Sequence, residues 1–287
     1  MRSISIDSPA KLNLALRILR KRKDGYHELV TLFHRISLRD TLRLRKRKNG
    51  IRLHCAHPRV PLKGNLIVSA FRLLKQRHPF EGGVTVHLTK RIPVGGGLGG
   101  GSSNAAAFLM GMKRLFRLRL TRNQWMKLGK ELGADVPFFI SGVAHALGRG
   151  RGDEIETLPF RRRLWFILWT CDRGLSTREV YSRFRLRERL TGASRDVKMA
   201  SAFLEKGDAE RASRFLKNDL TECAEQINSS LKKTRKSLSA LHLGVCQMSG
   251  SGPTLFMIFT SPHQARRALH RFRSLRAGHK MILCRSD

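Results

Sequence analysis

Acidic side chains are scarce in this 287-residue chain. It carries 21 Asp and Glu against 57 Lys and Arg, which gives a formal net charge of +36 at pH 7. No Asp or Glu occurs from Gly82 through Lys130, and only Glu131 and Asp135 occur between Gly82 and Gly152. Any chemistry in this stretch that needs a carboxylate therefore has only these two candidates.

Other features are missing as well, and each absence excludes a class of protein. No apolar stretch approaches the ~20 residues of a membrane span, and Met1–Ala10 lacks the apolar core of a signal peptide. The five cysteines form no C-x-x-C pair, which argues against a zinc site or a disulfide framework. With 41% hydrophobic residues, the chain is expected to be a soluble two-domain protein of the reducing cytoplasm.

The most distinctive segment is rich in glycine. Residues 93–104 read PVGGGLGGGSSN, and before them Val84, Val86 and Leu88 alternate with polar residues, as in a strand. After the glycines, apolar residues recur at helical spacing, namely Ala105, Phe108, Leu109, Met112, Leu115 and Phe116. A strand, a glycine loop and a helix start in this order direct backbone N–H groups and the positive end of a helix dipole at one point. The segment is therefore a candidate phosphate site.

Three known glycine loops and a flexible linker compete for this segment. Gly95, Gly97 and Gly100 satisfy G-x-G-x-x-G, but the acidic residue expected ~20 positions later in a dinucleotide site is missing. A P-loop needs Lys and then Ser or Thr after its last glycine, whereas Ser102 follows Gly101. The His-Arg-Asp and Asp-Phe-Gly signatures of protein kinases do not occur. A linker is not expected between a strand and an amphipathic helix that flank it this closely.

The positive charge favours a rival interpretation, a basic nucleic-acid-binding protein. Basic clusters are spread over the whole chain, and such a surface attracts RNA or DNA in a salt-dependent way. Aromatic residues make up only 7% of the chain, however, and no known nucleic-acid-binding signature interleaves them with the charge. We therefore expect non-specific attraction of polyanions, without a dedicated nucleic-acid site.

The remaining pattern predicts helices and strands mixed throughout the chain. One helix is expected after Asn65 and another up to Gly133, and a change in composition predicts a domain boundary near residues 158–163. The second half is expected to contain a strand at Leu164–Trp169, helical stretches at 195–217 and 219–242, a glycine turn at 249–253 and a buried strand at Leu255–Phe259.

Phosphoryl transfer to an alcohol needs a group that takes the proton of the hydroxyl. Glu131 lies in a helical pattern and is most simply a surface residue. Asp135 lies in LGADVPFF, where a carboxylate among apolar residues is costly without a partner, and it is either a helix cap or a catalytic base. Lys11 interrupts a strand-like segment and is either an edge residue facing water or an inward functional charge. The residues alone leave both alternatives open.

Five motifs taken together resemble the GHMP kinase superfamily, in order along nearly the full chain. They are residues 9–14, 24–27 (DGYH), 93–104, 133–139 and 248–253. The resemblance implies an α+β, two-domain GHMP kinase fold. A ribosomal-protein-S5-like N-terminal ATP-binding domain would span residues 1–160, and a ferredoxin-like C-terminal domain would span residues 161–287.

The DGYH and LGADVPFF segments narrow the resemblance to the branch that acts on a cytidine diphosphate conjugate of methylerythritol. This resemblance implies phosphorylation of the 2-hydroxyl of that conjugate by ATP, accompanied by Mg²⁺, in the non-mevalonate route to isoprenoids. Another GHMP kinase of small molecules is the alternative.

The resemblance also assigns roles at the matching positions. Asp135 falls on the catalytic base, Lys11 on the lysine that pairs with it, and Asn13 close to the substrate alcohol. The ATP phosphates are expected at Pro93, Val94, Gly95, Gly96, Gly97, Leu98, Gly99, Gly100, Gly101, Ser102 and Ser103, and the adenine near Asn65, Leu66 and Lys90.

The cytosine base gives a further expectation, because the chain has only two tyrosines. In the family that the chain resembles, aromatic side chains sandwich the base, and Tyr26 and Tyr181 fall on those positions. His27 would read the edge of the base, and Phe33 would lie nearby. Stacking on both faces would favour a cytidine over a bare sugar alcohol.

Overall fold

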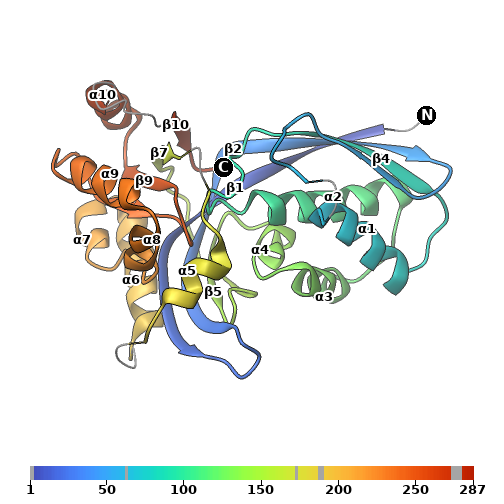
Figure 1. The fold of residues 1–287 in the computed structure, drawn as a ribbon, viewed down its shortest axis with the longest axis horizontal. Helices are drawn as coiled ribbons and strands as arrows, with labels where there is room; N and C mark the ends of the chain where they lie inside the picture. Colours follow the sequence, from blue (N-terminus) through green and yellow to red (C-terminus); the bar gives the residue numbers. More distant parts are fainter. Residues whose placement is uncertain (1–2, 62–63, 172–173, 187–190, 273–279) are drawn as a thin grey trace. The chain divides into compact units, whose positions relative to one another are not determined.

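The structure is a computed structural model that describes residues 3–61, 64–171, 174–186, 191–272 and 280–287 (Figure 1). Its chain forms two compact units that interleave along the sequence. Unit 1 comprises Met1–Ala10, Leu38–Val94 and Gly99–Val143, and unit 2 comprises Lys11–Ser37, Gly95–Leu98 and Ala144–Asp287. The predicted domains, residues 1–160 and 161–287, follow the order of the sequence and stay a prediction.

The two long N-terminal strands run through both units. They are β1 (Ser3–Lys21) and β2 (His27–Arg47), and they pair with each other. In unit 1 the second part of β2 pairs antiparallel with β4 (Gly83–Thr89), which pairs in parallel with β3 (Ile51–His54). In unit 2 the first part of β2 pairs with β5 (His145–Arg149), which pairs with β6 (Glu154–Thr157).

Helices cover one side of the strands of unit 1 (Figure 1). They are α1 (Leu66–Arg77), α2 (Gly100–Phe116), α3 (Arg122–Leu132) and α4 (Val136–Ser141). Helix α1 begins directly after Asn65, and α3 ends directly before Gly133. These bounds confirm the helices predicted at both places. The strand and the helix predicted on either side of the glycine loop are confirmed as β4 and α2. The apolar residues Phe108, Leu109 and Met112 of α2 are fully buried.

A second sheet lies in unit 2 and has the strand order β10-β7-β9-β8, with every pairing antiparallel. Its strands are β7 (Trp165–Thr170), β8 (Cys246–Met248), β9 (Leu255–Phe259) and β10 (Lys280–Arg285). Helices separate β7 from β8, and α10 (Pro262–Phe272) separates β9 from β10. This β-α-β-β-α-β order is the ferredoxin-like arrangement that was predicted.

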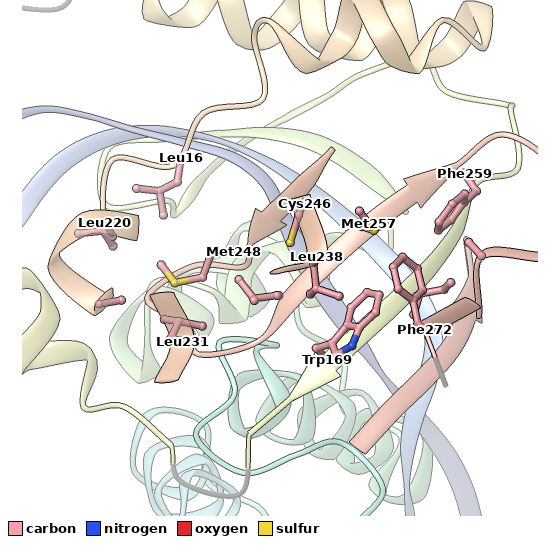
Figure 2. Close-up of a cluster of buried hydrophobic side chains, with 14 of the residues drawn as sticks. Leu16, Trp169, Leu220, Leu231, Leu238, Cys246, Met248, Met257, Phe259 and Phe272 are labelled. Carbon is pink, nitrogen blue, oxygen red and sulfur yellow. The ribbon is translucent and has the colours of Figure 1, made fainter. Parts of the chain in front are cut away.

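Apolar side chains from this sheet and its helices form the core of unit 2 (Figure 2). The indole of Trp169 on β7 meets the ring of Phe272 on α10 edge to face, with ring centres 4.6 Å apart. All five residues of β9 are buried, as expected for a central strand. The labelled members of this core are Leu16, Trp169, Leu220, Leu231, Leu238, Cys246, Met248, Met257, Phe259 and Phe272.

The two long helical stretches predicted at 195–217 and 219–242 are wrong as continuous helices. In their place the structure has α6 (Ala193–Lys206), α7 (Ala209–Ser213), α8 (Thr221–Ile227) and α9 (Ser229–Ser239), after the earlier α5 (Thr177–Arg183). Gly207 ends α6 with a φ of 81°, and the side chain of Asp208 caps α7. The side chain of Asn228 accepts from Leu231 N and starts α9. These caps interrupt an apolar periodicity that reads as continuous.

A pair of buried histidines joins several segments of unit 2. His34 on β2 and His145 on β5 share a hydrogen bond between their Nδ1 atoms, 2.8 Å apart. The Nε2 of His34 bonds to Ser286 Oγ, and the Nε2 of His145 bonds to Ser201 Oγ on α6, both at 2.8 Å. Burial lowers the pKa of His34 to about 3 and the pKa of His145 well below its ordinary value. Both rings are therefore neutral in the folded protein at pH 7.

We predict that this pair makes the folded state sensitive to acid. Below pH ~6.5 the unfolded chain protonates both histidines, whereas the folded chain keeps them neutral until the pH approaches their lowered pKa values. The unfolding free energy should then fall as the pH drops, by about 1.4 kcal/mol per pH unit for each such proton. Denaturant melts between pH 7 and 5 measure this slope. A double variant His34→Gln/His145→Gln should lose stability less steeply, and an unchanged slope would contradict the prediction.

Candidate active site

The glycine loop connects β4 to α2, and its chain passes from unit 1 into unit 2 and back. Gly95, Gly97 and Gly99 have φ angles of 72°, 73° and 68°, which residues other than glycine rarely adopt. Gly99 is the N-cap residue of α2, no side chain caps this helix, and its first turn has no acidic residue. An anion is the ordinary partner for such a helix start.

Side chains and backbone of unit 2 hold the tip of this loop. The amide of Lys11 on β1 donates to Leu98 O at 3.0 Å, and its Nζ donates to Gly97 O at 3.2 Å. The hydroxyl of Ser249 donates to the same Gly97 oxygen at 3.0 Å. A Cβ on Gly97 would lie 2.3 Å from Ser249 O, so only glycine fits there. The loop tip therefore has one defined path through unit 2.

Lys11 and Asn13 point into unit 2, since each is only 3% exposed. Of the two alternatives for Lys11, an edge residue facing water and an inward charge, the burial supports the inward charge. Its Nζ donates to Asn13 Oδ1, and Asn13 Nδ2 donates to Thr31 Oγ1 at 2.8 Å. The hydroxyl of Thr31 in turn donates to Ala15 O at 2.7 Å. This chain of hydrogen bonds fixes which end of the Asn13 amide faces Lys11.

The second glycine turn, residues 249–253, lies against the same side chains. Gly250 has a φ of 57°, and a Cβ there would lie 2.9 Å from Asn13 Oδ1. Asn218 Nδ2 holds the turn by donating to Met248 O at 2.7 Å and to Gly250 O at 2.8 Å. Our sequence reasoning missed Thr31 and Asn218. The signal for Thr31 was a hydroxyl in an apolar strand, whereas nothing local marked Asn218.

Asp135 lies in unit 1, at the N-cap position of α4. Its side chain makes no capping hydrogen bond to that helix, which weakens the capping interpretation of this residue. The side chain is neither buried nor fully exposed, so a ligand can reach it. Because Lys11 belongs to the other unit, the pairing of Lys11 with Asp135 stays a prediction.

Three of the residues predicted to recognise the base lie in unit 2: Tyr26 directly before β2, His27 at the start of β2, and Tyr181 on α5. The rings of His27 and Tyr181 have centres 5.3 Å apart, and Phe184, which we had not predicted, meets His27 edge-on at 5.9 Å. Tyr26 is 55% exposed. Burial lowers the pKa of His27, and the nearby Lys21 lowers it further. A neutral imidazole can both donate and accept a hydrogen bond, as contact with a base edge requires.

Arg151 supports Tyr26 from one side. Its guanidinium carbon lies 5.0 Å from the centre of the Tyr26 ring, and its Nη2 donates to Asp153 Oδ2 at 3.0 Å. Phe33 is buried, and a Cβ on Gly148 would lie 2.5 Å from its ring. Its ring also receives the Lys11 ammonium at 5.6 Å. Phe33 is therefore a buried packing residue beside Lys11.

The residues predicted near adenine lie in unit 1. Asn65 caps α1, since its Oδ1 accepts from Ile67 N at 3.0 Å and its Nδ2 donates to Pro61 O at 3.1 Å. Leu66 Cδ1 would be 3.7 Å from a Cβ on Gly101, which places Leu66 beside the loop. The side chain of Lys90 is only 5% exposed, and its ammonium pairs with Asp40. A contact of Lys90 with adenine would therefore fall mainly to its backbone.

Within the described ranges, no group of three or more His, Cys, Asp or Glu residues is arranged to hold a metal ion. No helix of the described part is both long and apolar enough to cross a membrane. The cysteines described are not bonded to one another.

Known proteins resemble this chain over most of its length. The description "GHMP kinases N terminal domain" matches residues 65–143, and "GHMP kinases C terminal" matches residues 199–276. The 4-diphosphocytidyl-2-C-methyl-D-erythritol kinase of Syntrophus aciditrophicus is 39% identical over 92% of this chain and 93% of that protein. The protein of the same name from Marinobacter nauticus is 38% identical over 92% of this chain and 88% of its own.

Solved structures give the same result. A crystal structure of 4-(cytidine 5'-diphospho)-2C-methyl-D-erythritol kinase matches with a TM-score of 0.81 at 32% identity, over 99% of this chain and 100% of that chain. Homoserine kinase from Cytophaga hutchinsonii matches with a TM-score of 0.72 at 18% identity, over 100% of this chain and 95% of that chain, which shows the fold alone. The chain therefore belongs to the GHMP kinases and, among them, to the 4-diphosphocytidyl-2-C-methyl-D-erythritol kinase family.

Proposed function

We propose that this chain transfers the γ-phosphate of ATP to the 2-hydroxyl of 4-diphosphocytidyl-2-C-methyl-D-erythritol, in the cytoplasm, as a step of isoprenoid synthesis. The observation that carries the proposal is the buried contact of Lys11 with Asn13 and with the Gly97 carbonyl. This contact joins a cation and an amide side chain to the backbone of the glycine loop. The names of the relatives supply the acceptor.

Asp135 would take the proton of the 2-hydroxyl as the hydroxyl oxygen attacks the γ-phosphorus, and ADP leaves with the electron pair of the broken P–O bond. Lys11 would pair with Asp135 and stabilise negative charge on the transferred phosphoryl group. Asn13 would orient the alcohol, because Thr31 and Lys11 already hold its amide in one orientation. These three side chains would act on the alcohol and on the transferred phosphoryl group.

The glycine loop, Pro93–Ser103, would bind the phosphates with its amides, with adenine near Asn65, Leu66 and Lys90. Mg²⁺ would neutralise phosphate charge when bound. The absence of a three-ligand cluster in the described residues fits a cation that arrives with ATP and keeps phosphate oxygens and waters as its main ligands. Of the two loop hydroxyls, Ser102 is partly exposed and is chemically suited to complete such a shell, whereas Ser103 is buried and its Oγ accepts a hydrogen bond from Ser8.

Tyr26 and Tyr181 would stack on the cytosine, and His27 would contact its edge. The proximity of His27 to Tyr181 supports this part of the proposal, because it gathers a ring face and a neutral imidazole in one place. Phe33 would lie nearby. Stacking faces accept any base, so selection of cytosine falls to the edge contact.

Release of ADP tests the proposal directly. With ATP and Mg²⁺, the protein should release ADP with 4-diphosphocytidyl-2-C-methyl-D-erythritol and far less with mevalonate or homoserine at equal concentration. Preference for either of these acceptors would make the chain another GHMP kinase. ATP binding without turnover on any of the three acceptors would contradict the proposed substrate.

Asp135→Asn should lower kcat by about 10²–10⁴-fold, the range typical for loss of a general base. ATP affinity, measured by calorimetry, should stay close to that of the wild type, because Asp135 reacts with the alcohol and not with the nucleotide. Lys11→Met should act on the same step, so the double variant should lose much less than the product of the single losses. Independent, multiplying losses would show that the two residues do not act as a pair.

Tyr26→Ala and Tyr181→Ala should each weaken capture of the cytidine substrate by roughly 5- to 150-fold, the equivalent of one lost stacking face. Steady-state kinetics should show this in the KM of the acceptor, while the KM of ATP stays unchanged. Tyr26→Phe and Tyr181→Phe keep the ring and serve as matched controls, and they should behave like the wild type. Equal kcat/KM for the Ala and Phe variants would remove the tyrosines from the base site.

A further inference from the structure

Asp40 is a fully buried carboxylate on β2, in unit 1. Burial of a carboxylate is expensive unless the group is paired and hydrogen-bonded. In a chain with so few acids, an aspartate in a strand interior is unexpected. Its surroundings show what compensates for its burial.

Each oxygen of Asp40 accepts two hydrogen bonds. Oδ1 accepts from the backbone amides of Arg91 and Ile92, at 2.7 Å and 2.9 Å. Oδ2 accepts from Asn104 Nδ2 at 2.9 Å and from the ammonium of Lys90, whose side chain is only 5% exposed. The carboxylate thus has a complete set of donors and one countercharge.

These partners come from the two segments that flank the glycine loop. Lys90, Arg91 and Ile92 lead into the loop, and Asn104 lies in the helix that follows it. Asn104 also donates to Ser8 Oγ at 2.8 Å, and the Ser8 hydroxyl donates to Ser103 Oγ at 2.8 Å. Both ends of the loop are therefore tied to the Asp40 carboxylate, and the Ser8 hydroxyl adds a second tie at the α2 end.

The packing agrees with the hydrogen bonds. A Cβ on Gly100 would lie 3.1 Å from Ile92 Cγ2 and 3.2 Å from Lys90 Nζ. The first turn of α2 thus lies directly against the segment that enters the loop. Loss of the Asp40 contacts would allow these two segments to move apart.

We propose that Asp40 is a positioning residue for ATP. It holds both ends of the glycine loop, so the amides at the start of α2 point at the phosphates before the nucleotide arrives, and Lys90 serves mainly as its buried countercharge. The inference rests on the proposed function, since it takes ATP as the ligand of the loop. Hydrogen-bond donors that are already ordered bind a ligand more tightly, because binding then loses less conformational entropy.

Asp40→Asn tests the proposal, because the amide nitrogen of Asn would face the donors of Lys90 and Asn104. Calorimetry should show ATP binding weakened by roughly 5- to 150-fold, the range for a buried donor left unpaired. The KM of the alcohol acceptor should stay unchanged. Leu74→Ala, in the buried face of α1, is the control for general loss of stability in unit 1. It should lower the melting temperature without changing the affinity for ATP.

Two further variants keep the proposal testable where Asp40→Asn does not fold. Asn104→Ala leaves Asp40 in place and removes the hydrogen bonds from α2 to Asp40 and Ser8. It should weaken ATP binding at a melting temperature no lower than that of Leu74→Ala. The exchange Asp40→Asn/Asn104→Asp returns a carboxylate to the cluster and should regain ATP affinity relative to Asp40→Asn.

The outcomes separate this inference from the proposed function. Wild-type ATP affinity in folded Asp40→Asn, or in Asn104→Ala, would overturn the positioning role while the kinase proposal stands. Equal loss of ATP affinity in Leu74→Ala would overturn it as well, since the effect would then follow stability alone. A wild-type protein that binds no ATP would instead contradict the proposed function.

Discussion

The path of the glycine-loop tip depends on the absence of a side chain at Gly97. The carbonyl oxygen of Ser249 occupies the place of its Cβ, and the carbonyl oxygen of Gly97 accepts hydrogen bonds from Lys11 and Ser249. Any side chain at this position would push the loop away from both donors. Lys11 would then lose an acceptor, and the hydrogen bonds that continue through Asn13 to Thr31 would lose their starting point.

The few acidic residues of the chain include carboxylates that are buried and paired with cations. The buried carboxylates of the described residues are Asp40, Asp153 and Glu225, and each pairs with a cation, namely Lys90, Arg151 and Arg235. The hydrogen bonds that Arg151 donates to Asp153 and Arg235 donates to Glu225 raise the pKa of both arginines. Two of these pairs lie beside proposed ligand sites, at the glycine loop and at Tyr26. Each of these buried carboxylates thus has a positive partner that offsets the cost of its burial.

Local patterns predicted elements well where a start or stop signal accompanied the periodicity. Asn65 marked the start of α1 and Gly133 marked the end of α3, and the alternation of apolar and polar residues predicted β4. Between residues 195 and 242 the same reasoning failed. Apolar spacing continued through Gly207 and Asn228, where caps end one helix and begin another. Periodicity records which faces are buried, and it does not record where the axis of a helix changes direction.

The sequence by itself determined the glycine loop, the family resemblance and the residue types available for chemistry, because these depend on neighbours along the chain. Tertiary structure decided that Lys11 is buried, that Thr31 orients Asn13, and that Asp40 joins the two ends of the loop. Asp40 and Asn104 are 64 residues apart, and Asn13 and Ser249 are 236 apart. Only folding brings such pairs within hydrogen-bond distance, so no local pattern of residues can reveal them.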